Sequence, residues 1–249
     1  MIVMISTLLV MSLGLVGMEV NIAGSRSAKP VYECRRTDGQ INIDGPLTER
    51  SWRLAKEVDL TLTDSHTPPL FGTRAKLLWD DRYLYVSFQC VDDGIYAKKT
   101  KKNDALWQEE AVEVFLDFEG KGKRYVEIEV NPLNAVFDKF MNGSRKPLPE
   151  NLWDSGVRTT VHLENKSING SSTVAGWTVE LAFPFEALKG KGHLPPKSGD
   201  EWRINLYRVK HYPVKEFSAW SPTNSVDFHQ PERFGVLVFS DKDVVEKEQ

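Results

Sequence analysis

The sequence lacks the features that mark several large classes of protein. It has only two cysteines in 249 residues, which excludes a disulfide-rich scaffold and the cysteine clusters of structural zinc sites. Its 32 Lys and Arg nearly balance its 35 Asp and Glu, so the composition gives no basic footprint for a nucleic acid or an anionic membrane partner. Signatures of serine hydrolases, zinc proteases, phosphate-binding loops and EF-hands are also missing. The composition that remains is that of an ordinary globular domain.

Long apolar runs are scarce as well, and the one that stands out covers residues 1–20. With the small residues at 23–25 it predicts a signal peptide over 1–24, and therefore a secreted or periplasmic protein. No Lys or Arg precedes the run, so two alternatives stay open: an uncleaved N-terminal anchor, and a cytoplasmic protein that starts at Met18. No later stretch reaches the roughly eighteen apolar residues that a membrane span needs.

The two cysteines, Cys34 and Cys90, each lie in a segment with the character of a strand. Two buried free thiols are the favoured interpretation. A single Cys34–Cys90 bridge is the alternative if the protein is exported, because disulfides persist in oxidising compartments.

What the chain does have is a strict alternation of apolar and polar residues. In the segment 83–90, Leu84, Val86 and Phe88 fall on one face and polar or aromatic residues on the other, as in a half-buried strand. The same period of two recurs in later segments, at 112–118, 125–131, 157–163, 177–183, 202–209 and 234–239.

This pattern predicts one all-β domain over residues 31–240. We expect an antiparallel β-sandwich, jelly-roll-like or immunoglobulin-like, since short strands separated by turn residues at this spacing are typical of sandwiches. Helical periodicity is limited to 47–57 and to a turn at 185–188. A charged tail, 241–249, follows the domain.

Carboxylates recur on the polar faces of these segments: Glu113, Asp117, Glu127, Glu129 and Glu180. Two carboxylates about 5 Å or about 6.5–9.5 Å apart could hydrolyse a glycosidic bond with retention or inversion. Carboxylates on one concave sheet face could instead accept hydrogen bonds from sugar hydroxyls without any chemistry. A solvated sheet face is the third interpretation.

Six blocks of sequence, taken in order, resemble one known family. They begin with IDGPLTERSWRLA at 43–55 and continue at 75–86, 107–117, 176–185, 219–221 and 228–235. In their residues and in their order, these blocks resemble carbohydrate-binding module family 9, and the resemblance covers about residues 43–239. The resemblance implies a β-sandwich that binds sugar, and it implies that Trp52, Trp79, Trp177, Trp202 and Trp220 are structural.

In that family a sugar is clasped between two aromatic rings, and polar side chains bond its hydroxyls. The resemblance places the ligand-binding role on six residues here: Trp107, Glu113, Glu129, Asn131, Ser225 and Phe228. Trp107 and Phe228 would be the two rings, although Phe228 is a smaller platform than tryptophan. Glu129 stands where a basic side chain is expected, which leaves the identity of the sugar open.

The resemblance also implies bound calcium, although no cofactor is required for binding. Asp92, Asp93 and Asp104 are the candidate ligands near one loop, but the lysines between them, at 98–102, would repel a cation. We therefore expect at most a structural calcium elsewhere, with unknown ligands.

The leading functional hypothesis is a non-catalytic, monomeric carbohydrate-binding protein. Its ligand would be a mono- or oligosaccharide or a glycan chain end, such as that of glucan or xylan, in polysaccharide utilisation. One alternative is a small glycoside hydrolase that uses carboxylates such as Glu113 and Glu180. A second alternative is a sandwich that has lost its ligand. No nucleic-acid partner is expected, and no membrane partner beyond an N-terminal anchor.

Overall fold

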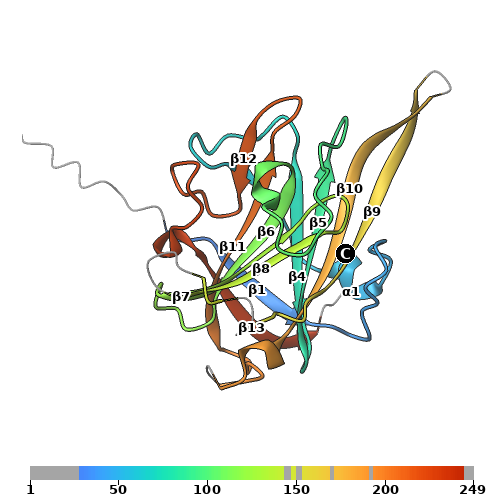
Figure 1. The fold of residues 1–249 in the computed structure, drawn as a ribbon. Helices are drawn as coiled ribbons and strands as arrows, with labels where there is room; N and C mark the ends of the chain where they lie inside the picture. Colours follow the sequence, from blue (N-terminus) through green and yellow to red (C-terminus); the bar gives the residue numbers. More distant parts are fainter. Residues whose placement is uncertain (1–27, 143–146, 150–152, 169–170, 191–192, 244–249) are drawn as a thin grey trace, which may run out of the picture.

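The computed structural model describes residues 28–142, 147–149, 153–168, 171–190 and 193–243 (Figure 1). The predicted signal peptide at 1–24 and the last part of the charged tail, 244–249, lie outside these residues. Within the described ranges, none of the helices is long and apolar enough to cross a membrane.

Strands make up most of the described chain. Their bounds are β1 Val31–Arg36, β2 Glu57–Asp59, β3 Thr61–Leu62, β4 Thr73–Trp79, β5 Tyr83–Val91, β6 Ala111–Asp117, β7 Arg124–Val130, β8 Val136–Asn142, β9 Arg158–Ile168, β10 Ser171–Pro184, β11 Glu201–Lys210, β12 Glu216–Ala219 and β13 Gly235–Asp243. The helical segments in the same ranges are short: α1 Arg50–Leu54, η1 Leu106–Gln108, η3 Phe185–Leu188 and η4 Pro231–Arg233. The predicted all-β class is therefore confirmed.

Neighbouring strands are hydrogen-bonded in the order β8-β7-β6-β11-β13-β1-β4-β5-β10-β9. In addition, β12 pairs with β11, and β2 pairs with β4. The predicted antiparallel arrangement holds only approximately. The first strand, β1, lies between β13 and β4 and is parallel to both of them. Local alternation could not show this, because it reports which face a residue occupies and not which strand pairs with it.

The path of strands folds over so that its two halves enclose one core. Val126 and Ile128 from β7 belong to the same apolar cluster as Val86 and Phe88 from β5. Figure 1 shows the strands β6, β7 and β8 crossing in front of β4 and β5 as a second layer. This is the predicted sandwich.

The aromatic residues expected to be structural are mostly buried. Trp52, Trp79, Trp177 and Trp202 are buried, and Trp220 is half-buried against the core. Gly235 is needed beside Trp220, because a Cβ atom there would lie 2.3 Å from the indole ring. Cys34 and Cys90 are both buried and unpaired, in agreement with the favoured interpretation of two free thiols.

A second apolar cluster lies on the other face of β6, β7, β8 and β11, away from the main core. It contains Phe115, Tyr125, Met141 and Tyr207, together with Phe228 and Phe234 from the loop that precedes β13. Because this loop packs on the sheet, the face is hollowed rather than flat, and the candidate site lies there.

Candidate functional site

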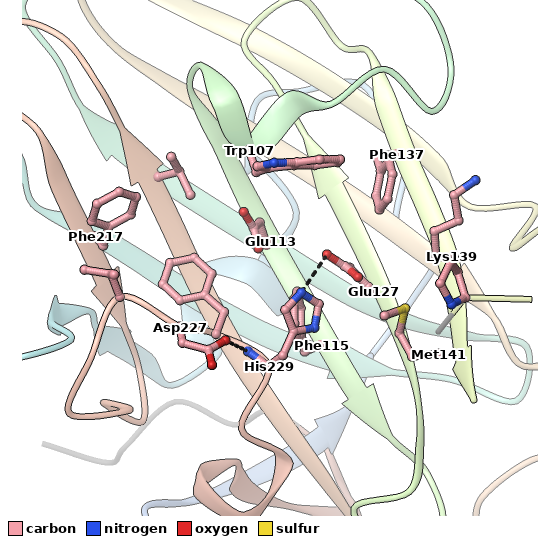
Figure 2. Close-up of a pocket in the computed structure, with 14 residues that line it drawn as sticks. Trp107, Glu113, Phe115, Glu127, Phe137, Lys139, Met141, Phe217, Asp227 and His229 are labelled. Carbon is pink, nitrogen blue, oxygen red and sulfur yellow. Dashed lines mark hydrogen bonds and ion pairs between the residues drawn. The ribbon is translucent and has the colours of Figure 1, made fainter. Parts of the chain in front are cut away.

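A pocket of about 320 Å³ opens on this second face (Figure 2). Its volume lies at the lower end of the range of about 300–1,000 Å³ that is usual for small-molecule sites. The residues that line it come from η1, β6, β7, β8, β11, β12 and the segments around them: Trp107, Glu113, Phe115, Glu127, Phe137, Lys139, Met141, Pro147, Val209, Phe217, Val226, Asp227, Phe228 and His229. Aromatic walls with a few carboxylates are the composition expected of a sugar site.

Trp107 forms one edge of the pocket and keeps 44% of its surface exposed. It lies on η1, whose first residue, Leu106, is buried against Phe137 and so turns Trp107 outward. The indole ring meets the ring of Phe137 edge-on, with centroids 5.2 Å apart. His211 Nε2 lies 3.1 Å from the carbonyl oxygen of Trp107 and fixes the backbone from the other side. An exposed indole on an anchored backbone is suited to stacking with a ligand.

Phe228 also lines the pocket but is only 7% exposed. Its ring stacks on Tyr207 at a centroid distance of 4.1 Å and an interplanar angle of 9°, and it meets Phe217 edge-on. The Tyr207 hydroxyl donates a hydrogen bond of 3.0 Å to the Phe228 carbonyl oxygen. Phe228 is therefore a wall that is shared with the core, whereas Trp107 is an exposed platform.

Three glutamates meet at the base of the pocket. Glu113 on β6 pairs in register with Glu129 on β7, and Glu127 lies two residues before Glu129 on the same face of β7. One carboxylate oxygen from each of the three lies within 4.8 Å of the other two. Like charges directly opposite on neighbouring strands repel one another, so this arrangement needs a compensating proton or cation.

Two of these glutamates have oxygens with no hydrogen-bond partner among the described residues. They are Oε1 of Glu113 and both oxygens of Glu129, although the Trp107 backbone N–H and the Glu127 carboxyl lie close enough to Glu129 to influence its pKa. Glu113 is 2% exposed and Glu129 is 0% exposed. Of the pair, Glu113 lines the pocket and Glu129 lies behind it. Buried acceptors without donors are costly, which marks this base as a place for a ligand with donors or positive charge.

Burial raises the pKa of all three carboxyl groups. The pKa of Glu113 lies well above its usual range because of burial, with a further contribution from the charge of Glu127. Burial likewise raises the pKa of Glu129 well above that range, and the charges of Glu113 and Glu127 add to the effect. Burial raises the pKa of Glu127 to about 7, and the contact with Glu129 and, to a lesser extent, the charge of Lys139 on β8 oppose this rise.

The pocket contains further polar residues that the sequence did not single out as ligand contacts. His229 Nδ1 lies 2.8 Å from the Tyr125 hydroxyl, and its Nε2 lies 4.0 Å from Glu127 Oε1 (Figure 2). The Asp227 carboxylate accepts the His229 backbone N–H. His229 immediately follows Phe228, so its place in that sequence block was the available signal. Lys139 and Phe137 belong to β8, a strand that the alternation analysis did not assign.

Three of the six predicted residues are not part of the pocket lining: Glu129, which lies behind it, and Asn131 and Ser225. Asn131 is fully buried, its amide group donates to the Lys99 carbonyl, and its Oδ1 accepts from the N–H groups of Leu133 and Ala135. Ser225 Oγ accepts hydrogen bonds from Asp227 N and from Gln230 Nε2 within the loop before β13. In this structure both side chains stabilise the loops that frame the pocket. Their direct contact with a ligand stays a prediction.

Glu180, the second carboxylate of the glycosidase hypothesis, lies elsewhere. Its Oε2 accepts from the backbone N–H groups of Asp44 and Gly45, and its Oε1 accepts from Trp52 Nε1 at 2.8 Å. It therefore connects β10 to the segment around α1. Glu180 is not among the residues that line the pocket, so it does not form a catalytic pair there with Glu113.

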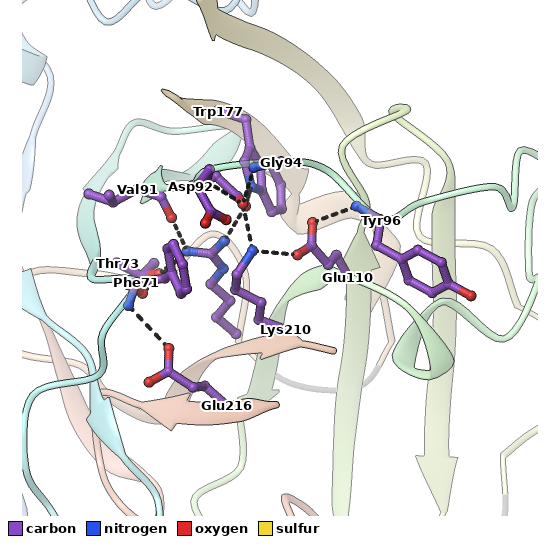
Figure 3. Close-up of polar contacts among 12 residues, drawn as sticks. Phe71, Thr73, Val91, Asp92, Gly94, Tyr96, Glu110, Trp177, Lys210 and Glu216 are labelled. Atoms are coloured by element: carbon purple, nitrogen blue, oxygen red, sulfur yellow. Dashed lines mark hydrogen bonds and ion pairs between the residues drawn. The ribbon is translucent and has the colours of Figure 1, made fainter. Parts of the chain in front are cut away.

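Of the predicted calcium candidates near the lysine-rich loop, Asp92 is already engaged by cationic side chains. Asp92 is buried, and its oxygens lie 2.6 Å from Arg208 Nη2 and 2.5 Å from Lys210 Nζ (Figure 3). Lys210 also contacts Glu110, at 2.8 Å. Because Arg208 and Lys210 already neutralise the Asp92 carboxylate, this side chain is not available to bind calcium. Asp104 accepts a backbone N–H from Lys101 as part of its own loop.

The same ion network holds the loop that carries Trp107. Glu110 accepts the backbone N–H of Tyr96 as well as the Lys210 ammonium, and Glu109 accepts the backbone N–H groups of Lys98 and Lys99. These contacts tie the loop before η1 to the start of β6. The position of Trp107 thus depends on buried charges some distance from the pocket.

Comparisons with known proteins agree with this geometry. The profile of carbohydrate-binding family 9 matches residues 57–239. A candidate carbohydrate-binding protein from Bacteroides uniformis has the same fold, with a TM-score of 0.69 at 17% identity, over 86% of this chain and all of that one. A family 9 carbohydrate-binding module from Caldicellulosiruptor kristjanssonii in complex with cellotriose gives a TM-score of 0.60 at 18% identity, over 88% and 100% of the two chains.

Among curated proteins, endo-1,4-beta-xylanase C from Paenibacillus barcinonensis is 28% identical over 155 residues. The match covers 61% of this chain but only 12% of the xylanase, so it concerns one part of a much longer enzyme. The profile match spans most of the strands that build the sandwich and the pocket, and on that ground the chain belongs to carbohydrate-binding family 9.

Proposed function

We propose that the chain binds carbohydrate without cleaving it, in the pocket between Trp107 and Phe228. The observation that carries the proposal is the half-exposed Trp107 ring beside a cavity whose base holds buried, unpaired carboxylate oxygens. A pyranose offers C–H groups to an aromatic face and hydroxyl donors at its edge. The indole would take the ring face, and Glu113 would accept from a hydroxyl.

The size of the pocket favours a small ligand. At about 320 Å³ it accommodates one or two sugar units, so a monosaccharide or the end of an oligosaccharide chain is the proposed ligand. Structural neighbours of this chain were solved in complex with cellotriose and with glucose. Glucose and short β-glucans are therefore the first ligands to test, and xylo-oligosaccharides follow because of the match to a xylanase.

The test is a titration of the purified chain with glucose, cellotriose and xylotriose. Binding is followed by tryptophan fluorescence and calorimetry, and the same mixtures are assayed for new reducing ends after long incubation. We expect a saturable signal with at least one sugar and no release of reducing ends. Turnover that disappears in Glu113→Gln would support the glycoside hydrolase instead, since this change keeps the shape and removes the titrating group. A folded protein with neither signal would indicate a sandwich that has lost its ligand.

Export to the periplasm or the medium, and a role in polysaccharide utilisation, form part of the proposal. Export is supported by the apolar run at 1–20 followed by small residues. N-terminal sequencing of protein recovered outside the cytoplasm should find a start near Ser25 or Arg26. An intact N-terminus on cytosolic protein would contradict export.

A further inference from the structure

Four lysines lie within five residues shortly before η1, the segment that carries Trp107. They occupy positions 98, 99, 101 and 102 in a chain whose formal net charge is -3. We infer that this lysine loop, residues 98–102, is an anion subsite outside the pocket, and that it binds the carboxylate of a uronic acid unit in a glycan whose neutral end lies in the pocket. The inference rests on the proposed binding of carbohydrate and names the class of glycan.

The first argument is the fixed position of the lysine loop beside Trp107. Glu109 Oε2 accepts the backbone N–H groups of Lys98 and Lys99, at 2.8 Å and 3.1 Å. The amide group of Asn131, directly after β7, donates to the Lys99 carbonyl oxygen at 2.8 Å. Because Glu109 follows Trp107 by two residues, these bonds tie the backbone of the loop to the segment that presents the indole ring.

The second argument is where the ammonium groups lie. Lys99 Nζ is 3.3 Å from Oε1 of Gln108, an exposed residue that is adjacent to Trp107 in the chain. Lys98 is exposed, and its Nζ lies 5.4 Å from the centroid of the Tyr96 ring. None of the lysines of the loop lines the pocket. The positive charge is therefore on the surface next to the sugar platform, and not inside the cavity.

The third argument is that most of this positive charge has no acidic partner. Lys102 Nζ contacts the carboxylates of Asp154 and Asp138. Within the described ranges, the other three lysines of the loop make no ion pair. Their mutual repulsion is relieved when an anion binds between them.

The acidic side chains nearest to the loop in the sequence are engaged elsewhere. Glu109 is buried and accepts two backbone N–H groups, as described above. Asp104 accepts the backbone N–H of Lys101, and Glu110 is paired with the buried ammonium group of Lys210. These carboxylates hold the shape of the loop and do not contact its ammonium groups.

The acidic unit of the glycan has to lie outside the pocket. A carboxylate inside it would face Glu113, Glu127 and Asp227, all of which belong to the lining, and like charges brought together at a binding site oppose association. A neutral end unit against Trp107 followed by a uronic acid unit beyond it satisfies both regions. An ammonium group is a compact charge with no fixed orientation, which suits a carboxylate on a flexible branch.

The test compares two ligands of the purified full chain by calorimetry: xylotriose, and xylotriose that carries a glucuronic acid substituent. The acidic ligand should bind about three- to tenfold more tightly at low salt, as expected of one or two exposed ion pairs. Most of this preference should disappear at about 500 mM sodium chloride, because salt screens exposed charges. Cellotriose, free glucuronate and inorganic sulfate are titrated in parallel.

Two double variants locate the subsite. Lys99→Gln combined with Lys101→Gln removes two of the unpaired charges and should abolish the preference for the acidic ligand. The readout is the ratio of the two affinities, so a general effect on the pocket cancels. Lys121→Gln combined with Lys123→Gln is the matched control. It removes two exposed lysines from the turn between β6 and β7, at the opposite end of β6 from η1, and should keep the preference.

Equal affinity for the two xylotrioses at low salt would overturn the inference, and so would a preference that survives in the Lys99→Gln, Lys101→Gln protein. Free glucuronate or sulfate that binds as tightly as the acidic oligosaccharide would also contradict it, because the loop would then bind any anion without the pocket. In each of these cases, binding of xylotriose or cellotriose leaves the proposed function intact. Absence of binding by every oligosaccharide, neutral or acidic, would overturn both proposals.

Discussion

The ring of Phe228 stacks on the ring of Tyr207, with centroids 4.1 Å apart and planes 9° from parallel. One face of Phe228 is therefore already occupied by the protein. Trp107 on the opposite edge is 44% exposed, so the two predicted sugar platforms differ in what holds them. This difference gives the first two predictions.

Trp107→Ala should weaken sugar binding by about 1–3 kcal/mol, by analogy with the stacking of bases on aromatic side chains. It should change the free energy of unfolding by less than about 1 kcal/mol, because the ring is half exposed and Leu106 remains to anchor η1. Calorimetry and urea denaturation measure the two effects separately. Tyr212→Ala, which removes an exposed ring that does not line the pocket, should leave binding intact. If Trp107→Ala strongly lowers the free energy of unfolding but the folded variant binds sugar with unaltered affinity, the ring is structural.

Phe228→Ala should instead destabilise the fold by about 3–5 kcal/mol, since it removes a buried ring and leaves a cavity beside Tyr207. Tyr207→Phe should cost only about 1 kcal/mol, the value of its lost hydrogen bond to the Phe228 carbonyl oxygen. Urea denaturation monitored by circular dichroism gives both values. Phe228→Ala with unaltered stability would mean that the stack is not maintained in solution.

The glutamate cluster predicts that the stability of the folded protein falls as the pH rises toward neutrality. Glu127 has a pKa of about 7 in the folded chain, against an ordinary value of 4.5. Below pH 4.5 both states are protonated. Between 4.5 and 7 the unfolded chain releases a proton that the folded chain keeps, so the free energy of unfolding falls as the pH rises. The loss attributable to Glu127 is on the order of 3 kcal/mol and is complete above pH 7.

Urea denaturation from pH 4.5 to pH 8 measures this slope. Glu129→Gln should flatten it, because it removes a second carboxyl group whose pKa burial raises well above its usual range. Glu33→Gln, at a half-exposed carboxyl on β1, should not. Stability that rises across the window and is insensitive to Glu129→Gln would contradict the prediction.

Lys210→Met should lower the free energy of unfolding by about 3–5 kcal/mol. The change leaves Glu110 buried without its cationic partner and Asp92 with Arg208 alone. It should also disorder the loop that presents Trp107, so tryptophan emission should shift before global unfolding. Lys189→Met, which removes an exposed ammonium group paired with Glu186, is the control and should leave unfolding unchanged. Equal stability of the two variants would show that the buried network is not needed.

The sequence was sufficient to predict the class of fold and the faces of most strands. Alternation with a period of two is a local property, so Leu84, Val86 and Phe88 could be placed in the core, and Glu113, Glu127 and Glu129 on the opposite face, from spacing alone. The pocket is on that face. Strands without clear alternation, such as β8 with Phe137 and Lys139, were missed for the same reason.

Only the tertiary structure decided which of these residues meet. Alternation assigns a face, but hydrogen-bond register assigns neighbours, and it is register that sets Glu113 against Glu129 and separates both from Glu180. The loop before β13 approaches the sheet through long-range packing, which brings Phe228 onto Tyr207 and buries most of the ring. The burial that leaves Glu113 and Glu129 without partners arises from the same packing. Burial and pairing depend on segments far apart in the chain, so no local pattern encodes them.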